Sequence, residues 1–156
     1  MSHVYMIGDL HFGHSRIPNF RTMFSTEAEH TDYICGNWKT TVTERDVVYV
    51  LGDAAFTQAG LERIGELPGR KILVRGNHDG LKTIRYMAVF DEVEGIYPYK
   101  HSWLTHCPIH PAELRGRFNV HGHTHAGGPD GDYFDVCCEH IGYTPIRYDK
   151  IRERFW

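Results

Sequence analysis

The sequence predicts a single α/β domain with two β-sheets, because its hydrophobic pattern changes character halfway along the chain. In the first half, short apolar runs alternate with helical patterns, which indicates parallel βαβ units with right-handed crossovers. In the second half, short strand-like runs are separated only by turn residues, which favours a mixed or antiparallel sheet. With 156 residues, 41% of them hydrophobic, the chain is long enough to bury one core. We therefore expect residues 1–156 to form one domain.

The first half is predicted to contain three strands and three helices. The strands cover residues 4–7, 46–51 and 71–74. A helix is expected to begin at Ser25-Thr26, where a hydroxyl cap precedes acidic residues, and Ile34 and Trp38 repeat at helical spacing. That helix should end in the β-branched run 40–43, a second helix should end at Pro68-Gly69, and a third should cover residues 81–87.

The second half is predicted to contain five short strands. They cover residues 93–99, 103–105, 118–121, 133–137 and 146–148. Glycine, proline and other turn residues separate these runs, and no helical pattern of comparable strength lies between them.

Composition and charge exclude several classes of protein. A net charge of −3 provides no basic surface for tight, non-specific binding of nucleic acid. The N-terminus lacks a cationic stretch followed by an apolar run, so we expect no signal peptide, and no apolar run is long enough to span a membrane. The cysteines show no CxxC spacing, which argues against a zinc ribbon, and we expect reduced thiols and a cytoplasmic protein. Cys107 is expected to be a buried, unreactive thiol.

Short motifs rich in His, Asp and Asn follow predicted strands along the chain. They are Gly8-Asp9-Leu10-His11, Gly52-Asp53, Gly76-Asn77-His78-Asp79, Thr105-His106-Cys107 and Gly122-His123-Thr124-His125. Ligand sites in open α/β sheets form beyond the carboxyl ends of the strands, so we expect these motifs to meet at one edge. His123 and His125 are two residues apart and point the same way if the segment is extended.

The residue types in these motifs predict a site for two metal ions. Imidazole, carboxylate and amide ligands suit Mn²⁺, our first choice, or Fe, Co²⁺, Ni²⁺ or Zn²⁺, and they do not suit an iron–sulfur cluster or an all-oxygen Ca²⁺ site. Two ions roughly 3.5–4 Å apart share a bridging carboxylate and a hydroxide that attacks phosphorus in line with the leaving group.

Other residues of the motifs are candidates for proton transfer and substrate contact. His78 is placed to protonate the leaving oxygen, and Asp79 is expected to orient the His78 imidazole and raise its pKa. His14, in the first loop, is a candidate for contact with the substrate phosphate, and so are four arginines, Arg16, Arg21, Arg115 and Arg117.

The order of the motifs from Asp9 to His125 resembles the calcineurin-like metallophosphoesterase family. The resemblance implies a four-layer α/β/β/α sandwich of two mixed sheets flanked by helices, with His78 as general acid. It also implies a first ion bound by Asp9, His11 and His125, a second bound by Asn77, His106 and His123, and a bridging Asp53.

Two departures from the family pattern narrow the range of expected substrates. Ala54-Ala55-Phe56 follows Gly52-Asp53 where the Ser/Thr phosphatase branch has Asp-Arg-Gly, and Asp79 stands where that branch has Glu. These differences argue against phosphoprotein substrates. The segments around His11 and His106 are similar to those of small phosphoesterases from bacteria and phages.

We therefore predict a metal-dependent phosphoesterase that hydrolyses phosphodiesters or nucleotide-like compounds. A nuclease or a cyclic-nucleotide phosphodiesterase is a narrower alternative within the same chemistry. A non-catalytic scaffold on the same fold, or a metal buffer or sensor, is an alternative of another class, against which the complete ligand set argues. The sequence indicates no membrane partner and identifies no protein partner.

Overall fold

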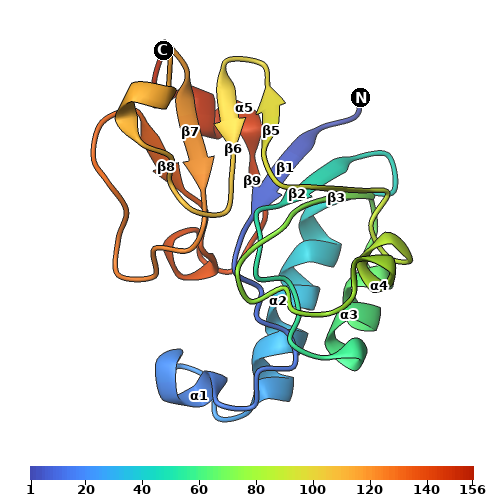
Figure 1. The fold of residues 1–156 in the computed structure, drawn as a ribbon. Coiled ribbons are helices and arrows are strands. Elements are labelled where there is room, and N and C mark those ends of the chain that lie inside the picture. Colours follow the sequence, from blue (N-terminus) through green and yellow to red (C-terminus); the bar gives the residue numbers. More distant parts are fainter.

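The computed structural model describes residues 1–156 and contains two mixed β-sheets flanked by helices, which confirms the predicted fold class (Figure 1). The first sheet has the strand order β4-β3-β2-β1-β9, in which β1 to β4 run parallel and β9 is antiparallel to β1. Its strands are β1 (Val4–Ile7), β2 (Val47–Val50), β3 (Arg70–Val74), β4 (Glu92–Glu94) and β9 (Ile146–Arg147).

The second sheet has the order β5-β6-β7-β8, with β6 to β8 parallel and β5 antiparallel. Its strands are β5 (Tyr97–Tyr99), β6 (Ser102–Leu104), β7 (Phe118–His121) and β8 (Tyr133–Asp135). The α-helices are α1 (Ile17–Phe20), α2 (Glu27–Thr41), α3 (Gln58–Gly65), α4 (Thr83–Met87) and α5 (Tyr148–Arg152), and two short 3-10 helices are η1 (Pro111–Glu113) and η2 (Cys138–His140). No helix is long and apolar enough to cross a bilayer.

Helix α2 follows the capping signal in the sequence. The Thr26 side chain accepts a hydrogen bond from the Glu29 amide at 3.0 Å, which satisfies one free donor of the first turn. The helix ends at Thr41, inside the β-branched run where the sequence predicted its end. Trp38 is fully buried and donates its indole hydrogen to the Pro68 carbonyl at 3.0 Å, which anchors the helix beside the first sheet.

The first sheet is buried on both faces, which explains the nearly continuous apolar run in β2. Val48 and Val50 point toward the helices and pack with residues such as Trp38. Tyr49 and Leu51 point the opposite way, into a second cluster shared with strands of the other sheet. The two sheets are thereby held face to face by apolar packing.

The structure differs from the sequence prediction in the segment 93–99. It forms two strands, β4 and β5, that belong to different sheets, because Gly95 and Ile96 bend the chain between them. Periodicity could not separate the two strands because each is only three residues long and only two residues lie between them. The helices α1 and α5 were also missed, since each is a single short turn.

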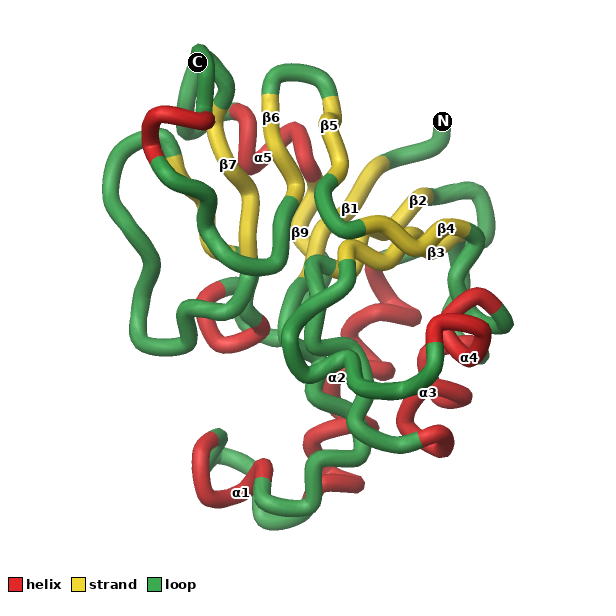
Figure 2. The backbone as a smooth tube through the Cα atoms, viewed as in Figure 1, coloured by secondary structure: helices red, strands yellow, loops and turns green.

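Loops, rather than helices, occupy the region beyond the carboxyl ends of β1, β2 and β3 (Figure 2). The parallel strands β6 and β7 of the second sheet lead into the loops that carry His106 and His123. An isolated parallel bridge between Gly8 and Cys137 joins the two sheets beyond β1 and β8.

Candidate metal centre

Backbone hydrogen bonds hold the motif-bearing loops in register beyond the strands. The Asp9 amide donates to the Gly52 carbonyl at 3.0 Å, and the His11 amide donates to the Asp53 carbonyl at 2.9 Å. In the other sheet the Gly122 amide donates to the His106 carbonyl at 2.9 Å. The loops therefore extend the parallel pairing of the strands and form a rigid edge.

Several side chains of this edge project from strained backbone. Asp9, His11, Asp53 and His123 have φ angles of 57°, 54°, 50° and 71°, in the left-handed region that residues other than glycine rarely adopt. Such conformations persist only where the surroundings enforce them, and they cluster at functional sites.

Two glycines allow the loops to approach one another closely. A Cβ atom at Gly52 would strike the His106 ring, and one at Gly122 would strike the Asp9 carboxylate. A larger residue at either position would displace a candidate ligand. The glycines in these motifs therefore make space for ligands as well as allowing turns.

A first group of potential ligands surrounds Asp9. Its Oδ1 lies 3.6 Å from His11 Nε2 and 3.5 Å from His125 Nε2. His11 Nε2 lies 3.6 Å from Asp53 Oδ2. Asp9 Oδ1 and His11 Nε2 are both buried and have no hydrogen-bond partner. Buried polar atoms of this kind are normally satisfied, so their convergence fits a bound cation.

A second group surrounds His106 Nε2. Asn77 Oδ1 lies 2.8 Å from this nitrogen, His123 Nδ1 lies 3.2 Å from it, and Asp53 Oδ1 lies 3.4 Å from it. His106 Nδ1 is 2.9 Å from the Leu51 carbonyl, which can only accept, so Nδ1 carries the hydrogen and Nε2 directs its lone pair at the group. The lone pairs gathered there also fit a cation.

Asp53 lies between the two groups, with Oδ2 toward His11 and Oδ1 toward His106. The structure thus brings together every residue that the sequence predicted as a metal ligand. These residues are Asp9, His11, Asp53, Asn77, His106, His123 and His125.

Ionised carboxylates at this edge favour cation binding, whereas the pKa values of the histidines shift in different directions. Burial alone would raise the pKa values of Asp9 and Asp53, but hydrogen bonds from histidines and backbone amides hold both below their ordinary value. Burial lowers the pKa of His11, whereas Asp53 raises that of His106 against the effect of burial and Glu139 raises that of His125. Ionised carboxylates and a neutral imidazole are the forms that bind metal ions.

Asp79 does not have the role that the sequence suggested. It is buried, and its carboxylate accepts hydrogen bonds from the amides of Asp53, Ala54 and Gly76 at 2.8–2.9 Å. Both of its oxygens are thereby directed at backbone amides and not at the His78 ring. Burial raises the pKa of Asp79. The residue instead fixes the two loops that carry Asp53 and Asn77.

His78 is exposed and stands beside the first ligand group. Its ring stacks on Phe56, with centroids 5.3 Å apart, and its centroid is 6.1 Å from that of His11. The backbone amide of His78 donates to Asp53 Oδ1 at 2.8 Å. Phe56, and not a carboxylate, orients the imidazole.

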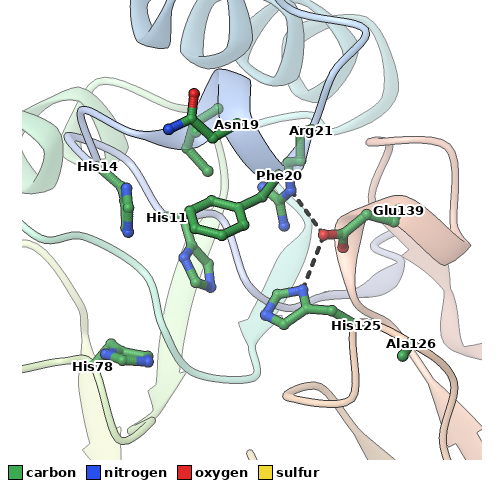
Figure 3. Close-up of a pocket in the computed structure, with 10 residues that line it drawn as sticks. His11, His14, Asn19, Phe20, Arg21, His78, His125, Ala126 and Glu139 are labelled. Carbon is green, nitrogen blue, oxygen red and sulfur yellow. Dashed lines mark hydrogen bonds and ion pairs between the residues drawn. The ribbon is translucent and has the colours of Figure 1, made fainter.

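A pocket of about 670 Å³ opens beside the first group (Figure 3). It is lined by His11, His14, Ile17, Asn19, Phe20, Arg21, His78, His125, Ala126 and Glu139. His14 thus lines this pocket, whereas Arg16 is exposed at the start of α1 and does not line it.

Arg21 lines the pocket but is not free to bind phosphate. Its side chain is only 2% exposed, and it donates to Glu139, to the Asp9 carbonyl and to His30. Burial and the adjacent guanidinium lower the pKa of His30 to about 3, so this imidazole is neutral and accepts the hydrogen bond.

Three features near the site could not be found from sequence motifs: two hydrogen bonds to candidate ligands and the exposed position of Cys107. Glu139 accepts a hydrogen bond from His125 Nδ1 at 2.9 Å, and Cys137 donates its thiol hydrogen to Asp9 Oδ2 at 3.1 Å. Cys107, expected to be buried, is exposed, and its sulfur lies within 4.8 Å of ring nitrogens of His106 and His123. Cys107 lies in the loop beyond the carboxyl end of β6, and partial burial together with Asp53 raises its pKa.

Comparison with known proteins gives consistent matches along the chain. The model of the calcineurin-like phosphoesterase family matches residues 2–154. An uncharacterized protein of Methanocaldococcus jannaschii is 29% identical over 165 residues, covering 97% of this chain and 90% of that protein. The gene 66 protein of Mycobacterium phage L5 is 29% identical over 161 residues, covering 100% of this chain and 71% of the phage protein.

Among solved structures, a protein of unknown function from Aquifex aeolicus superposes with a TM-score of 0.78 and 26% sequence identity. The match covers 98% of this chain and 99% of the other. The similarity therefore extends over the whole arrangement of the two sheets.

Proposed function

This chain belongs to the calcineurin-like phosphoesterase family, and from that premise we propose that it is a dinuclear metal-dependent phosphoesterase acting on phosphodiesters. The observation that carries the proposal is the convergence of two ligand groups on opposite oxygens of Asp53. The donor set of carboxylate, amide and imidazole atoms suits Mn²⁺, which we propose as the first choice, with Fe, Co²⁺, Ni²⁺ and Zn²⁺ as alternatives.

The proposed roles follow from where each side chain lies. Asp9, His11 and His125 would hold one ion, and Asn77, His106 and His123 the other, with Asp53 between them. When bound, the two ions polarise the phosphoryl group and activate the attacking water.

In this proposal, His78 donates a proton to the leaving oxygen of the substrate. The position of its imidazole at the pocket wall, next to His11, supports this role. Protonation of the leaving oxygen by this ring avoids the release of an alkoxide into water. The stacking contact with Phe56 holds the ring in place.

The pocket supports a substrate with a substituent larger than a simple alkyl group. Its volume of about 670 Å³ is in the range of small-molecule sites. Phe20, on α1, lines the pocket although it is 68% exposed, and Asn19 beside it offers an amide. An aromatic ring and an amide at the mouth of the pocket suit a planar, hydrogen-bonding group such as a nucleobase.

A screen of phosphate esters tests the proposed activity. We expect protein stripped with a chelator to be inactive and Mn²⁺ to restore hydrolysis, with bis(p-nitrophenyl) phosphate preferred over p-nitrophenyl phosphate. Ni²⁺ and Zn²⁺ are tested in parallel. Protein that binds two equivalents of metal but hydrolyses no mono-, di- or cyclic ester would be a metal buffer or scaffold, and the proposal would be rejected.

Replacing Phe20 with alanine tests the substrate class. Stacking on an aromatic side chain contributes about 1–3 kcal/mol per base, so Phe20→Ala should lower kcat/KM for the p-nitrophenyl ester of thymidine 5′-phosphate by roughly 5- to 160-fold. Hydrolysis of methyl p-nitrophenyl phosphate, which has the same leaving group and no base, should be nearly unchanged. Met23→Ala is the matched control, because Met23 is also exposed and does not line the pocket. Equal losses on both esters would contradict a base-binding role.

A further inference from the structure

A buried arginine and a carboxylate connect two residues of the first ligand group. Arg21 Nε donates to Glu139 Oε1 at 2.9 Å, and the same oxygen accepts a hydrogen bond from His125 Nδ1 at 2.9 Å (Figure 3). Arg21 lies in the loop after α1, Glu139 in η2, and His125 in the loop after β7.

The contact with Glu139 determines which nitrogen of His125 is free. A carboxylate so close to an arginine only accepts, so His125 Nδ1 carries the hydrogen and Nε2 directs its lone pair away. Nε2 lies 3.5 Å from Asp9 Oδ1, the buried oxygen that has no hydrogen-bond partner. Glu139 therefore selects the tautomer and the ring orientation that a cation in the first group requires.

Arg21 also contacts Asp9, another member of the first ligand group. Its Nη2 donates to the Asp9 carbonyl at 2.7 Å while its Nε holds Glu139. One planar guanidinium thus fixes both the strained backbone of Asp9 and the carboxylate that orients His125. Its third nitrogen, Nη1, lies 2.7 Å from His30, so none of the three is free for substrate.

We propose that Arg21 and Glu139 are positioning residues that pre-organise the first cation site through His125 and Asp9. The inference rests on the proposed function, because it assumes that this group binds a cation. Neither residue is proposed to react with substrate. Residues that hydrogen-bond metal-ligating histidines typically change metal affinity by 10- to 100-fold.

Titration of metal-free protein with Mn²⁺ tests the proposal without any assay of activity. We expect Glu139→Ala to weaken the binding of one of two Mn²⁺ ions by about 10- to 100-fold, and Glu139→Gln, which keeps an acceptor oxygen, to weaken it less. Arg21→Lys should weaken the same ion, since an ammonium group cannot hold Glu139 and the Asp9 carbonyl together. Glu113→Gln is the matched control, because Glu113 is exposed and its side chain contacts only Arg115.

Double-mutant cycles identify the site that is affected. In a His125→Ala background, Glu139→Ala should cause little further loss of Mn²⁺ affinity. In a His123→Ala background, Glu139→Ala should weaken Mn²⁺ binding by the same factor as it does in wild-type protein. The thermal midpoint of each metal-free variant shows whether it is folded. Glu139 is partly exposed, so Glu139→Gln remains informative even if Arg21→Lys does not fold.

Three results would overturn the proposal: Mn²⁺ affinity within twofold of wild type in Glu139→Ala, equal weakening of both ions, or a loss fully additive with His125→Ala. Failure of the proposed function has a different signature. Wild-type protein that binds no divalent cation would reject both proposals, whereas a wild-type enzyme with two ions and an unaffected Glu139→Ala variant would reject only this one.

Discussion

Alanine at Asn77 or at His123 is expected to abolish Mn²⁺-dependent hydrolysis of bis(p-nitrophenyl) phosphate. Each side chain places a potential ligand atom near His106 Nε2, Asn77 Oδ1 at 2.8 Å and His123 Nδ1 at 3.2 Å. Loss of either leaves the second cation with fewer ligands, and Lewis-acid stabilisation of the transition state is worth several kcal/mol. About 4 kcal/mol corresponds to a fall of roughly a thousandfold in kcat.

Metal content and stability show why the activity is lost. The variants should retain one tightly bound equivalent of Mn²⁺ in place of two, measured after gel filtration. Both residues are exposed, so their thermal midpoints without metal should stay close to wild type. His101→Ala is the matched control, because His101 is an exposed histidine next to β6 and far from the ligand groups in the fold. Full activity with one ion in the Asn77→Ala variant would contradict the two-metal centre.

Replacing His78 with alanine should slow hydrolysis by an amount that depends on the leaving group. General acid catalysis contributes about 10²- to 10⁴-fold, and the loss should approach this range for alkyl esters, whose alkoxides need a proton. Nitrophenyl esters leave as stable phenolates and should lose less than about tenfold. The measurement is log(kcat/KM) against leaving-group pKa, which should become steeper in the variant.

The His78 substitution leaves the metal centre intact, which makes the test specific. The hydrogen bond to Asp53 Oδ1 comes from the His78 backbone amide, and alanine retains it. Mn²⁺ stoichiometry should therefore equal that of wild type. The same loss for alkyl and nitrophenyl esters would remove the general-acid assignment and leave His78 as a residue that shapes the pocket.

Much of the fold could be predicted because its signals are local. The cap at Thr26, the end of α2 at Thr41 and the doubly buried strand β2 all depend on residues within a few positions of one another. The segment 93–99 could not be divided correctly, because β4 pairs with the preceding strand β3 and β5 with the following strand β6, and the residues of the segment specify neither partner.

The candidate ligands could be predicted because each motif combines a strand end, a glycine and a metal-binding residue type. The supporting contacts could not be predicted in this way. Asp79 accepts hydrogen bonds from backbone amides of the loop that carries Asp53, and not from the ring of the adjacent His78. Arg21 donates a hydrogen bond to Glu139, which lies 118 positions further along the chain.

The sequence by itself determined the kind of chemistry, since residue type and spacing set which donor atoms stand at the strand ends. Only the tertiary structure decided how those donors are held: Asp53 offers one oxygen to each group, Glu139 orients His125, and Arg21 joins Glu139 to Asp9. The physical reason is that hydrogen bonds and ion pairs act over about 3 Å in space, and separation along the chain does not specify which groups come that close.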